Sequence, residues 1–567
     1  MKNNITKIID ALKNWTKKFW PYLLVVVLIV FPWFGHSGYL FFTDYSIGPK
    51  INLDWTSSWF LINTLFKFLS FIFPLYFLEK IFIAATLFFV LLGGRKIVLL
   101  VSPTLTNGEE FKISPALVFI LSLFALFNPV VYDRLLYGQI GIVVAYGALL
   151  FVIAYLYRAA FTLEWKNLYG AAIFSALALM FSVHFIFFLA LFYVLFFVLL
   201  IGKCSEIKVT TKLWPLLRVL IVSLLIIIIL NANWLIALTT GASATLGFVA
   251  QGIGTQDLTA FATAGATPLQ TLTNILLMGG FWGAAQHRYI DFSAGDLWGL
   301  GFIFLLPLII YGIYISFKKA DYTHKILNSG LLIIFITAVV LALGIKTSFS
   351  NSISLFLYNH LPFYKGLREP QKWVAAMVPV YLYFLSWGVA KLSSKKWLVE
   401  NAVVVGIILA AVIIIQAPLL LFGFNHQVRP TNYPTSWSEV DRFLLNRSAD
   451  SYGCFDQVLF LPWHMYMHFS WIGNTVANPA SVFFSCPILV GTNMEWGGIY
   501  DNSLDARGLA VEKWLSIHGQ NNSLPSTVRY IILAKEVDWQ TYSWLDGLTY
   551  VKLIKDSDNL RLYEIDR

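Results

Sequence analysis

The sequence predicts a polytopic α-helical membrane protein with a small α/β domain after its last membrane span. Three observations lead to this fold class. Of the 567 residues, 58% are hydrophobic and only 12% are charged, whereas a soluble chain carries about 25% charged residues. Apolar runs of membrane-spanning length repeat throughout the part of the chain before Asn425. From Asn425 onward the composition becomes that of an ordinary soluble domain.

About eleven apolar runs approach the length of roughly 20 residues that a transmembrane helix needs. They lie at about 20–35, 79–94, 114–131, 139–157, 168–183, 184–202, 213–236, 297–317, 326–345, 374–390 and 400–423. A twelfth run, 57–78, contains Lys67 and Pro74, and we expect it to lie at the membrane interface. Ser182-Val183-His184 marks the hinge between the fifth and sixth spans.

The distribution of basic residues predicts the orientation of the chain. With a cytoplasmic N-terminus, the cytoplasmic segments hold 20 Lys and Arg residues, and the outer loops before the tail hold seven. Cytoplasmic loops of membrane proteins are enriched in basic residues. We therefore expect a cytoplasmic basic leader at 1–19, a transmembrane domain at 20–424 and an extracytoplasmic α/β domain at 425–567. The expected location is the plasma membrane, crossed many times.

The tail shows signals for both strands and helices. Buried strands are expected at 458–463 and 528–533, and amphipathic helices at 437–445 and 509–517. Residues 548–553 and 560–565 resemble a closing hairpin with its turn at 556–559. Cys454 and Cys486 could form a disulfide in an oxidising compartment, and two buried free thiols are an equal alternative.

Polar side chains near the membrane gather toward its predicted outer side. Ionisable groups in or beside spans are costly and are functional candidates for that reason. Asp44 and Asp54 lie in the first outer loop, and further candidates come from other outer turns: Asp133, Arg134, Gln139, His184, Asn231, Asn233, Gln286, His287, Arg288, Asp291, Asp296, Arg368, Glu369 and Lys372. We expect the large outer loop 237–296 to pack on the spans or to re-enter the membrane, lining a cavity.

Several classes of function are excluded by what the sequence lacks. The cytoplasmic loops are short and contain no Gly-rich phosphate-binding motif, which argues against an ATP-driven pump and against a cytoplasmic nucleotide-sugar donor. His464 and His468 are four residues apart, but Pro462 argues against a helix, so surface or packed histidines are favoured over a metal site. No groove-reading basic motif points to nucleic acid.

Two outer turns carry a family resemblance. Asn128-Pro-Val-Val-Tyr-Asp-Arg-Leu-Leu-Tyr-Gly-Gln139 resembles an Asn-Pro…Tyr-x-Arg…Gly-Gln turn, and Leu361-Pro-Phe-Tyr-Lys-Gly-Leu-Arg-Glu-Pro-Gln-Lys-Trp373 resembles a Pro…Arg-x-Pro-x-Lys/Arg turn. Both turns are similar to those of the GT-C superfamily of membrane glycosyltransferases, in its arabinofuranosyltransferase-like and YfhO-like groups of large prokaryotic proteins. The first-loop aspartate, the interfacial helix and the outer C-terminal domain agree with that resemblance.

The resemblance implies a membrane glycosyltransferase that works among membrane lipids at the outer face. Its donor would be a sugar on a polyprenyl phosphate, and its acceptor a cell-envelope glycan, lipid or glycoprotein. By resemblance, the first candidate for the catalytic acidic residue is Asp44 and the second is Asp54. No adjacent acid forms an Asp-x-Asp pair, so no metal ligand is assigned, and a divalent cation stays open as a cofactor.

The chemistry of such a transfer names the other candidates. A carboxylate beside the acceptor hydroxyl can take its proton, and fixed cations are needed where charge develops on the leaving phosphate. Arginine suits this role because it stays charged and grips phosphate through two N–H groups. We expect Arg368 and Arg134 to bind the phosphate first, with support from Arg288, His287, His184, Lys372 and Gln139.

Structural alternatives accompany these assignments. Asp44 could cap a helix or pair with Lys50, Arg134 could pair with a nearby acid, and Arg368 could bridge to Glu369 or to the tail. A lipid or saccharide transporter or flippase should show internal repeats and charges near the membrane midplane. Neither is apparent, so the enzyme is favoured over a transporter, and a non-catalytic protein of envelope assembly remains the third alternative.

Overall fold

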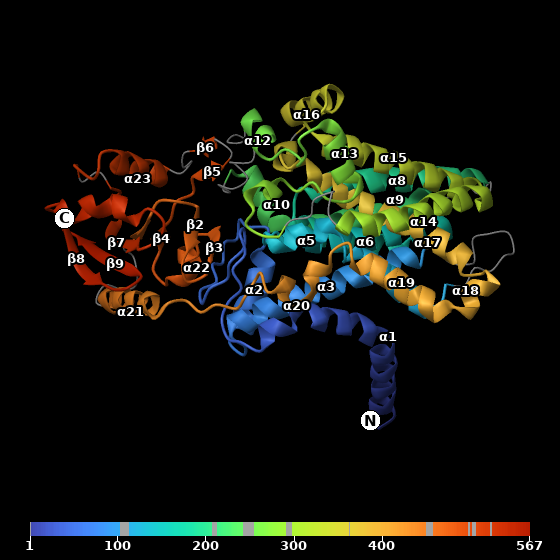
Figure 1. The fold of residues 1–567 in the computed structure, drawn as a ribbon, viewed down its shortest axis with the longest axis horizontal. Coiled ribbons are helices and arrows are strands. Elements are labelled where there is room, and N and C mark those ends of the chain that lie inside the picture. Colours follow the sequence, from blue (N-terminus) through green and yellow to red (C-terminus); the bar gives the residue numbers. More distant parts are fainter. Residues whose placement is uncertain are drawn as a thin grey trace.

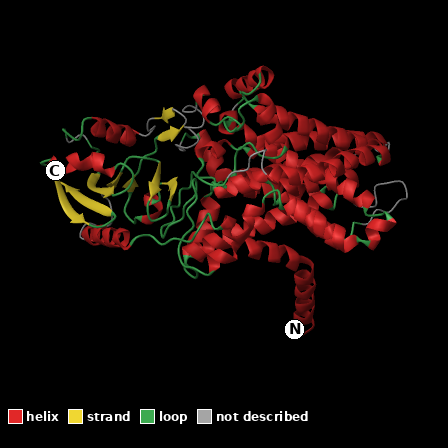
Figure 2. Cartoon of the chain, viewed as in Figure 1, coloured by secondary structure: helices red, strands yellow, loops and turns green. Residues whose placement is uncertain are grey.

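The computed structural model describes residues 2–101, 113–206, 213–241, 254–290, 297–361, 363–449, 457–496, 499–501, 506–521 and 524–566. The described chain forms a large bundle of helices and, at one end of it, a smaller part that contains all the strands (Figures 1 and 2). The helix α1, Lys2–Phe34, projects away from the bundle toward the N-terminus (Figure 1).

The helices of the bundle follow one another with short connections. They are α1, α2 (Phe60–Leu69), α3 (Leu75–Val98), α4 (Pro115–Ser122), α5 (Pro129–Leu136), α6 (Ile140–Thr162), α7 (Lys166–Phe181), α8 (Phe185–Glu206), α9 (Leu213–Leu230), α10 (Ala232–Thr239), α12 (Thr255–Ala260), α13 (Pro268–Leu276), α14 (Leu297–Lys319), α15 (Tyr322–Leu343), α16 (Ser348–His360), α17 (Val374–Leu392), α18 (Lys396–Glu400), α19 (Ala402–Ile414) and α20 (Leu421–Asn425).

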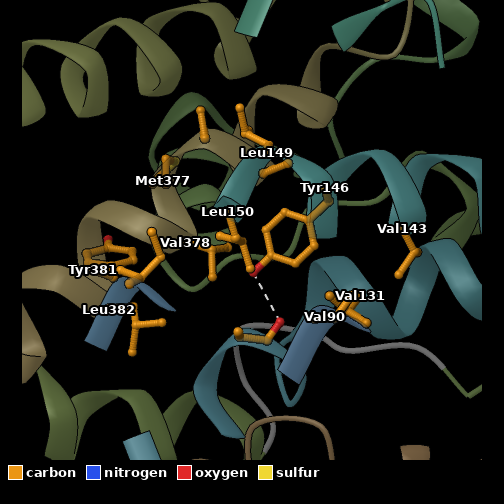
Figure 3. Close-up of a cluster of buried hydrophobic side chains, with 14 of the residues drawn as sticks. Val90, Val131, Val143, Tyr146, Leu149, Leu150, Met377, Val378, Tyr381 and Leu382 are labelled. Atoms are coloured by element: carbon orange, nitrogen blue, oxygen red, sulfur yellow. Dashed lines mark hydrogen bonds between the residues drawn. The ribbon is translucent and has the colours of Figure 1, made fainter. Parts of the chain in front are cut away.

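The centre of the bundle is built from α6 and α17. The apolar window of α17 is buried over its whole length, and that of α6 over 83%. Figure 3 shows side chains of α6 and α17 in one apolar cluster, where the hydroxyl of Tyr146 donates to the carbonyl of Ala125 at 3.0 Å. The helices α14 and α17 cross where Gly312 meets Gly388, and a Cβ on either glycine would overlap the opposing backbone. Small residues permit such close helix crossings in membranes.

The number of spans is lower by length and composition than the predicted eleven. In the described residues six helices are long and apolar enough to cross a membrane: α3, α6, α8, α14, α15 and α17. Three helix pairs pass the same test together but bend by 52° to 78° at a break, which gives up to nine. The predicted spans 20–35 and 168–183 correspond to shorter apolar helices, Lys18–Phe34 and Lys166–Phe181. The count of about eleven is therefore not confirmed.

The predicted interfacial run 57–78 is divided between two helices. Only Phe60–Leu69 forms α2, while the residues from Leu75 onward begin the long helix α3 after Pro74. The break arises because proline disfavours a helical conformation in the residue before it and serves well at a helix start. The position of α2 at a membrane interface and the orientation of the chain remain predictions.

The tail contains a mixed sheet in the order β4-β1-β7-β9-β8. Its strands are β1 (Gln457–Leu461), β4 (Ile488–Leu489), β7 (Val528–Ala534), β8 (Val551–Asp556) and β9 (Leu560–Ile565). The strands β4, β1 and β7 are parallel, and β9 is antiparallel to both β7 and β8. Small antiparallel pairs are β2 (Tyr466–Phe469) with β3 (Asn474–Ala477) and β5 (Met494–Trp496) with β6 (Ile499–Asp501).

The sequence patterns of the tail are confirmed by these elements. The strands predicted at 458–463 and 528–533 are β1 and β7, and the predicted hairpin is β8–β9. The predicted helices are α21 (Thr435–Ala449) and α23 (Ala506–Ser516); a short helix α22 (Ala480–Phe483) lies between β3 and β4. Cys454 lies outside the described residues, so the disulfide remains a prediction, as do the domain boundaries.

Candidate active site

The first outer loop lies between the helical bundle and the tail (Figure 1). Successive side chains face opposite sides: Leu40 and Phe42 belong to the core of the bundle, whereas Phe41 belongs to the core of the tail. This is the alternation of an extended strand. The tail holds the segment through its backbone, because the N–H of Ala477 donates to the carbonyl of Thr43 at 2.7 Å.

Asp44 follows this segment and is held from both sides. Its backbone N–H donates to the carbonyl of Tyr137 at 2.9 Å. The Nε2 of Gln139 donates to one carboxyl oxygen at 2.9 Å, and the hydroxyl of Tyr466 donates to the other at 2.9 Å. Gln139 comes from the turn before α6, and Tyr466 from β2 of the tail.

Gly138 allows the loop to lie this close to the bundle. Its φ is +79°, in the left-handed region that favours glycine. A Cβ at this position would lie 2.7 Å from the Cβ of Phe42 and 2.8 Å from the backbone nitrogen of Tyr45. The glycine of the Gly138-Gln139 pair therefore provides room for the Asp44 loop, and the glutamine binds its carboxylate.

A cavity of about 650 Å³ opens beside Asp44. Four of the predicted site residues line it: Asp44, Gln139, His184 and Lys372. The remaining lining is Tyr45, Ser46, Ile47, Lys50, Ile51, Asn52, Ser57, Ser58, Trp59, Ile62, Asn63, Phe66, Gly138, Gly141, Ile142, Phe181, Ser182, Val183, Phe363 and Val482. The wall thus combines a few charged and amide groups with many apolar side chains, and the tail contributes Val482.

Behind the cavity wall, a buried network joins the two motif turns. Arg134 donates to both Gln139 and Glu369. Glu369 also accepts from Lys372 at 3.0 Å and from the indole nitrogen of Trp282 at 2.9 Å. Arg134 is 2% exposed and Glu369 is 7% exposed, so both charges are compensated by each other and by Lys372. The network extends from Asp44 through Gln139 and Arg134 to Lys372.

Local sequence explains why each turn takes this shape. Asn128 ends the preceding helix, with its side-chain nitrogen donating to two carbonyls, and caps α5 by accepting from the N–H of Val131. Pro129 then occupies the first turn of α5, which proline favours. In the second motif, Pro370 starts the short 3-10 helix Pro370–Trp373 that carries Lys372 and leads into α17.

The charges around the cavity shift the pKa values of its groups. Burial raises the pKa of Asp44, the negative charge of Glu369 adds to this effect, and the hydrogen bonds from Gln139 and Tyr466 oppose it. Burial acts on Glu369 in the same direction, but Lys372 and Arg134 outweigh it and hold the pKa of that carboxyl well below its usual range. Burial lowers the pKa of His184 to about 3, so its imidazole is neutral.

Comparison with solved structures finds the same arrangement of helices elsewhere. The cryo-EM structure of the arabinofuranosyltransferase AftD from mycobacteria superposes with a TM-score of 0.58 at 12% identity, covering 97% of this chain and 40% of that one. The fold is that of the GT-C membrane glycosyltransferases. A mutant form of AftD gives a TM-score of 0.51 at 12% identity, over 97% of this chain and 42% of that one.

The chain spans about 40% of the length of AftD. ArnT from Cupriavidus metallidurans, bound to undecaprenyl phosphate, superposes with a TM-score of 0.48 at 12% identity, over 97% of this chain and 98% of that one. The sequence matches no protein-family model, and no curated protein matches it either. The GT-C resemblance of the two turns is thus matched at the level of the fold.

Other predicted residues of this GT-C fold lie away from the cavity wall. The guanidinium of Arg368 forms a salt bridge with Asp257 at 2.8 Å and lies over the ring of Phe261 at 4.5 Å. The structural alternative that paired Arg368 with Glu369 is wrong in its partner, because the loop 237–296 supplies Asp257 instead. Asp54 accepts from the N–H and the hydroxyl of Thr56, at 2.9 and 2.7 Å, and so closes its own turn.

The loop 237–296 packs on the bundle, as predicted, through its described residues. Trp282 bonds Glu369, and the hydroxyl of Thr263 donates to the carbonyl of Ala342. His287 is exposed in a left-handed turn, with Arg288 beside it. Neither residue is part of the cavity wall, and Asp291 and Asp296 lie outside the described residues.

Two residues of the site carry roles that the sequence did not indicate. Glu369 was expected only as a partner of Arg368, yet it is the shared acceptor for Arg134, Lys372 and Trp282. Tyr466 was not a candidate, because no local pattern relates a tail strand to the first loop. The structural alternative for Arg134, a nearby acid, is confirmed, whereas the carboxyl oxygens of Asp44 bond Gln139 and Tyr466 instead of Lys50. In the described residues no group of three or more His, Cys, Asp and Glu is arranged to hold a metal ion.

Proposed function

We propose that the protein is a GT-C-type glycosyltransferase that moves a sugar from a polyprenyl-phosphate donor to an acceptor hydroxyl. The observation that carries the proposal is the cavity of about 650 Å³, in which Asp44 shares the wall with Lys372 and His184. A carboxylate and a cation in one cavity meet the two needs of the reaction, a base for the acceptor and a positive charge for the leaving phosphate.

In this reaction Asp44 takes the proton of the acceptor hydroxyl. The oxygen of that hydroxyl forms a bond to the anomeric carbon of the sugar while the bond from that carbon to the phosphate oxygen breaks. The polyprenyl phosphate leaves with the electron pair of the broken bond. The raised pKa of Asp44 suits a general base, because proton transfer is most efficient when the pKa lies nearer the operating pH.

Lys372 is the cation that we assign to the leaving phosphate. It lines the cavity, and its position is fixed by Glu369 at 3.0 Å. Arg134 is buried behind the wall and takes a supporting role, since it orients Gln139 and Glu369. We expect Lys372→Met to weaken the binding of undecaprenyl phosphate and to lower turnover by roughly 10²- to 10³-fold, the usual cost of one lost electrostatic contact.

The apolar part of the cavity suits the lipid part of the donor. Ile62 and Phe66 of α2 face it together with Phe181 of α7 and Ile142 of α6. The helix α2 also exposes Leu61, Leu65 and Phe68 outside the cavity, as a helix in contact with lipid would. An isoprenoid chain could therefore pass from the cavity into the membrane along α2.

The experiment that tests the function is transfer from a panel of hexosyl- and pentosyl-polyprenyl phosphates by the purified protein in lipid nanodiscs. We expect Asp44→Asn to lower turnover by roughly 10²- to 10⁴-fold. Asp54→Asn is the matched control, because Asp54 lies in the same loop and bonds only Thr56. Equal turnover of the Asp44→Asn variant and the wild type would remove Asp44 from the reaction. Movement of lipid between leaflets without formation of product would favour a flippase instead.

We further propose the orientation and the domains that the sequence indicates. The leader 1–19 would be cytoplasmic, the bundle 20–424 would span the plasma membrane, and the tail 425–567 would face outward with the cavity. The acceptor would be a cell-envelope glycan, lipid or glycoprotein. Labelling of single cysteines placed at Ser470 and at Ser394 with an impermeant reagent tests this orientation. Only the cysteine at position 470 should react in intact cells.

A further inference from the structure

We propose that Tyr466 of the tail is a positioning residue of the active site, which holds the carboxylate of Asp44 in place for the reaction. This inference rests on the proposed function, in which Asp44 is the general base. It makes the tail a working part of the site instead of a separate binding module.

The geometry divides the two oxygens of Asp44 between two parts of the molecule. Gln139 of the bundle donates to one oxygen, and Tyr466 of the tail donates to the other, each at 2.9 Å. A carboxylate offers about four lone-pair sites. Each oxygen therefore retains a site for the acceptor hydroxyl after these two bonds are made, while the rotation of the carboxyl group is restrained.

Tyr466 is itself firmly placed by the fold of the tail. It pairs with Ala477 in the register of β2 and β3, and its neighbours Met467 and Phe469 are buried in the tail core. Ala477 donates its N–H to the carbonyl of Thr43, directly before Asp44. The strand that presents the hydroxyl of Tyr466 is thus joined, one hydrogen bond away, to the loop that presents the carboxylate.

Tyr466 remains a hydrogen-bond donor throughout the working pH range. Burial raises the pKa of its phenol well above the usual value, and the negative charge of Asp44 acts in the same direction. The other charged or titratable groups that act on this pair are Glu369, Arg134, Tyr289, Arg368 and Arg288. Of these, Arg368 and Arg288 act on the phenol of Tyr466, which gives these two predicted site residues an indirect influence on Asp44.

Removal of the hydroxyl has a defined consequence for Asp44. The hydrogen bond from Tyr466 favours the charged form of the carboxylate. Tyr466→Phe should therefore raise the pKa of Asp44, and activity should be lost at a higher pH as the solution is acidified. A hydrogen bond to a charged group corresponds to a shift of about 1–2 pH units and to a decrease in kcat of roughly 10- to 100-fold.

The matched control is Tyr563→Phe. The hydroxyl of Tyr563 donates to Asp546 at 3.0 Å, so this variant also removes a tyrosine–aspartate bond in the tail. Neither Tyr563 nor Asp546 lines the cavity. We expect the control to leave the pH profile unchanged, and the melting temperatures of the two variants show whether either change acts through folding.

The deciding experiment measures the carboxyl group directly. Protein labelled with ¹³C-aspartate in nanodiscs is titrated by infrared difference spectroscopy, and the band of Asp44 is identified by its loss in Asp44→Asn. Tyr466→Phe should displace the titration of that band to higher pH, and Tyr563→Phe should not. An unchanged titration in Tyr466→Phe would overturn the inference. Should Tyr466→Phe fail to fold, Tyr466→His, which retains a donor, is titrated in its place and should give an intermediate displacement.

The outcome separates this inference from the proposed function. If Asp44→Asn retains full transfer, the proposed function of Asp44 fails, while the infrared titration still reports whether Tyr466 binds it. If Asp44→Asn abolishes transfer and Tyr466→Phe changes neither kcat nor the titration, the function stands and the role of Tyr466 is wrong. When Tyr466 acts only through Asp44, adding Tyr466→Phe to Asp44→Asn should lower the residual turnover no further.

Discussion

The first outer loop contains two aspartates in two differently held halves. Asp54, in the second half, bonds Thr56, two residues away. Asp44, in the first half, bonds Gln139 and Tyr466, which lie 95 and 422 residues away in the chain. The side chains of the first half are divided between two hydrophobic cores, whereas Asp54 lies in an exposed turn. The comparison shows that distant contacts, and not the residue type, distinguish the candidate catalytic carboxylate.

The largest effect is expected where the supporting network of the first half is broken. Glu369→Ala leaves Arg134 and Lys372 without their shared carboxylate in a buried position. Loss of one partner from a buried ion pair costs about 3–5 kcal/mol, so the melting temperature should fall steeply and transfer should be abolished. Lys166 forms an exposed pair with Glu164, and Glu164→Ala should leave both properties unchanged. A stable, active Glu369→Ala variant would show that the network is not required.

The next effect comes from the contact between Gly138 and the Asp44 loop. Gly138→Ala adds a Cβ that overlaps Phe42 and Tyr45, besides the cost of about 1–2 kcal/mol for a left-handed backbone. We expect a decrease in transfer of at least tenfold, as Asp44 is displaced. Gly473→Ala is the matched control, because Gly473 has a similar φ of +74° with open space around it. Equal losses of stability and activity in both variants would attribute the effect to the backbone alone.

The acidity of Asp44 predicts the pH dependence of the wild type. Its folded-state pKa is raised above the ordinary value, mainly by burial. The carboxylate must be deprotonated to act as a base, so activity is complete above the raised pKa. Activity should then decrease about tenfold per pH unit as the pH falls below it. The acid limb of kcat/KM should consequently lie above pH 4, the ordinary range of an aspartate; a limb at or below that value would contradict the role of burial.

The smallest effect is expected in the second half of the loop. Thr56→Ala removes the hydroxyl that Asp54 accepts, at an exposed turn. Exposed substitutions of this kind usually change stability by no more than about 0.5 kcal/mol. Transfer should stay within twofold of the wild type in the same nanodisc assay. A loss comparable to that of Asp44→Asn would place the second half of the loop in the site after all.

Much of the architecture follows from local patterns. The apolar runs locate the helices of the bundle, and the strand and hairpin signals locate β1, β7, β8 and β9. The count of spans was less accurate, because a helix bent by 52° to 78° and a straight one have the same apolar composition. Asn128 and Pro129 do indicate a break, but the angle of that break is set by packing.

The candidate site was predictable in part. The two outer turns supply Gln139 and Lys372, and the first loop supplies Asp44, all of which line the cavity. The preference for Arg368 and Arg134 over Lys372 came from the chemistry of arginine alone. The structure buries Arg134 behind the wall and gives Arg368 a partner in Asp257. No sequence signal relates residues 111 positions apart, so the choice of partner could only come from the fold.

The division of Asp44 between its partners also sets a timetable for synthesis. The carboxylate leaves the ribosome early, whereas Tyr466 follows 422 residues later. At about 5–20 residues per second, that interval lasts roughly 20–80 s. During this time the loop is exported with one of its two hydrophobic faces uncovered, since the core that receives Phe41 has not yet been made. A nascent chain that stalls before β2 would thus insert its helices and remain without a complete catalytic centre, which protects a growing cell from premature consumption of its lipid-linked sugars.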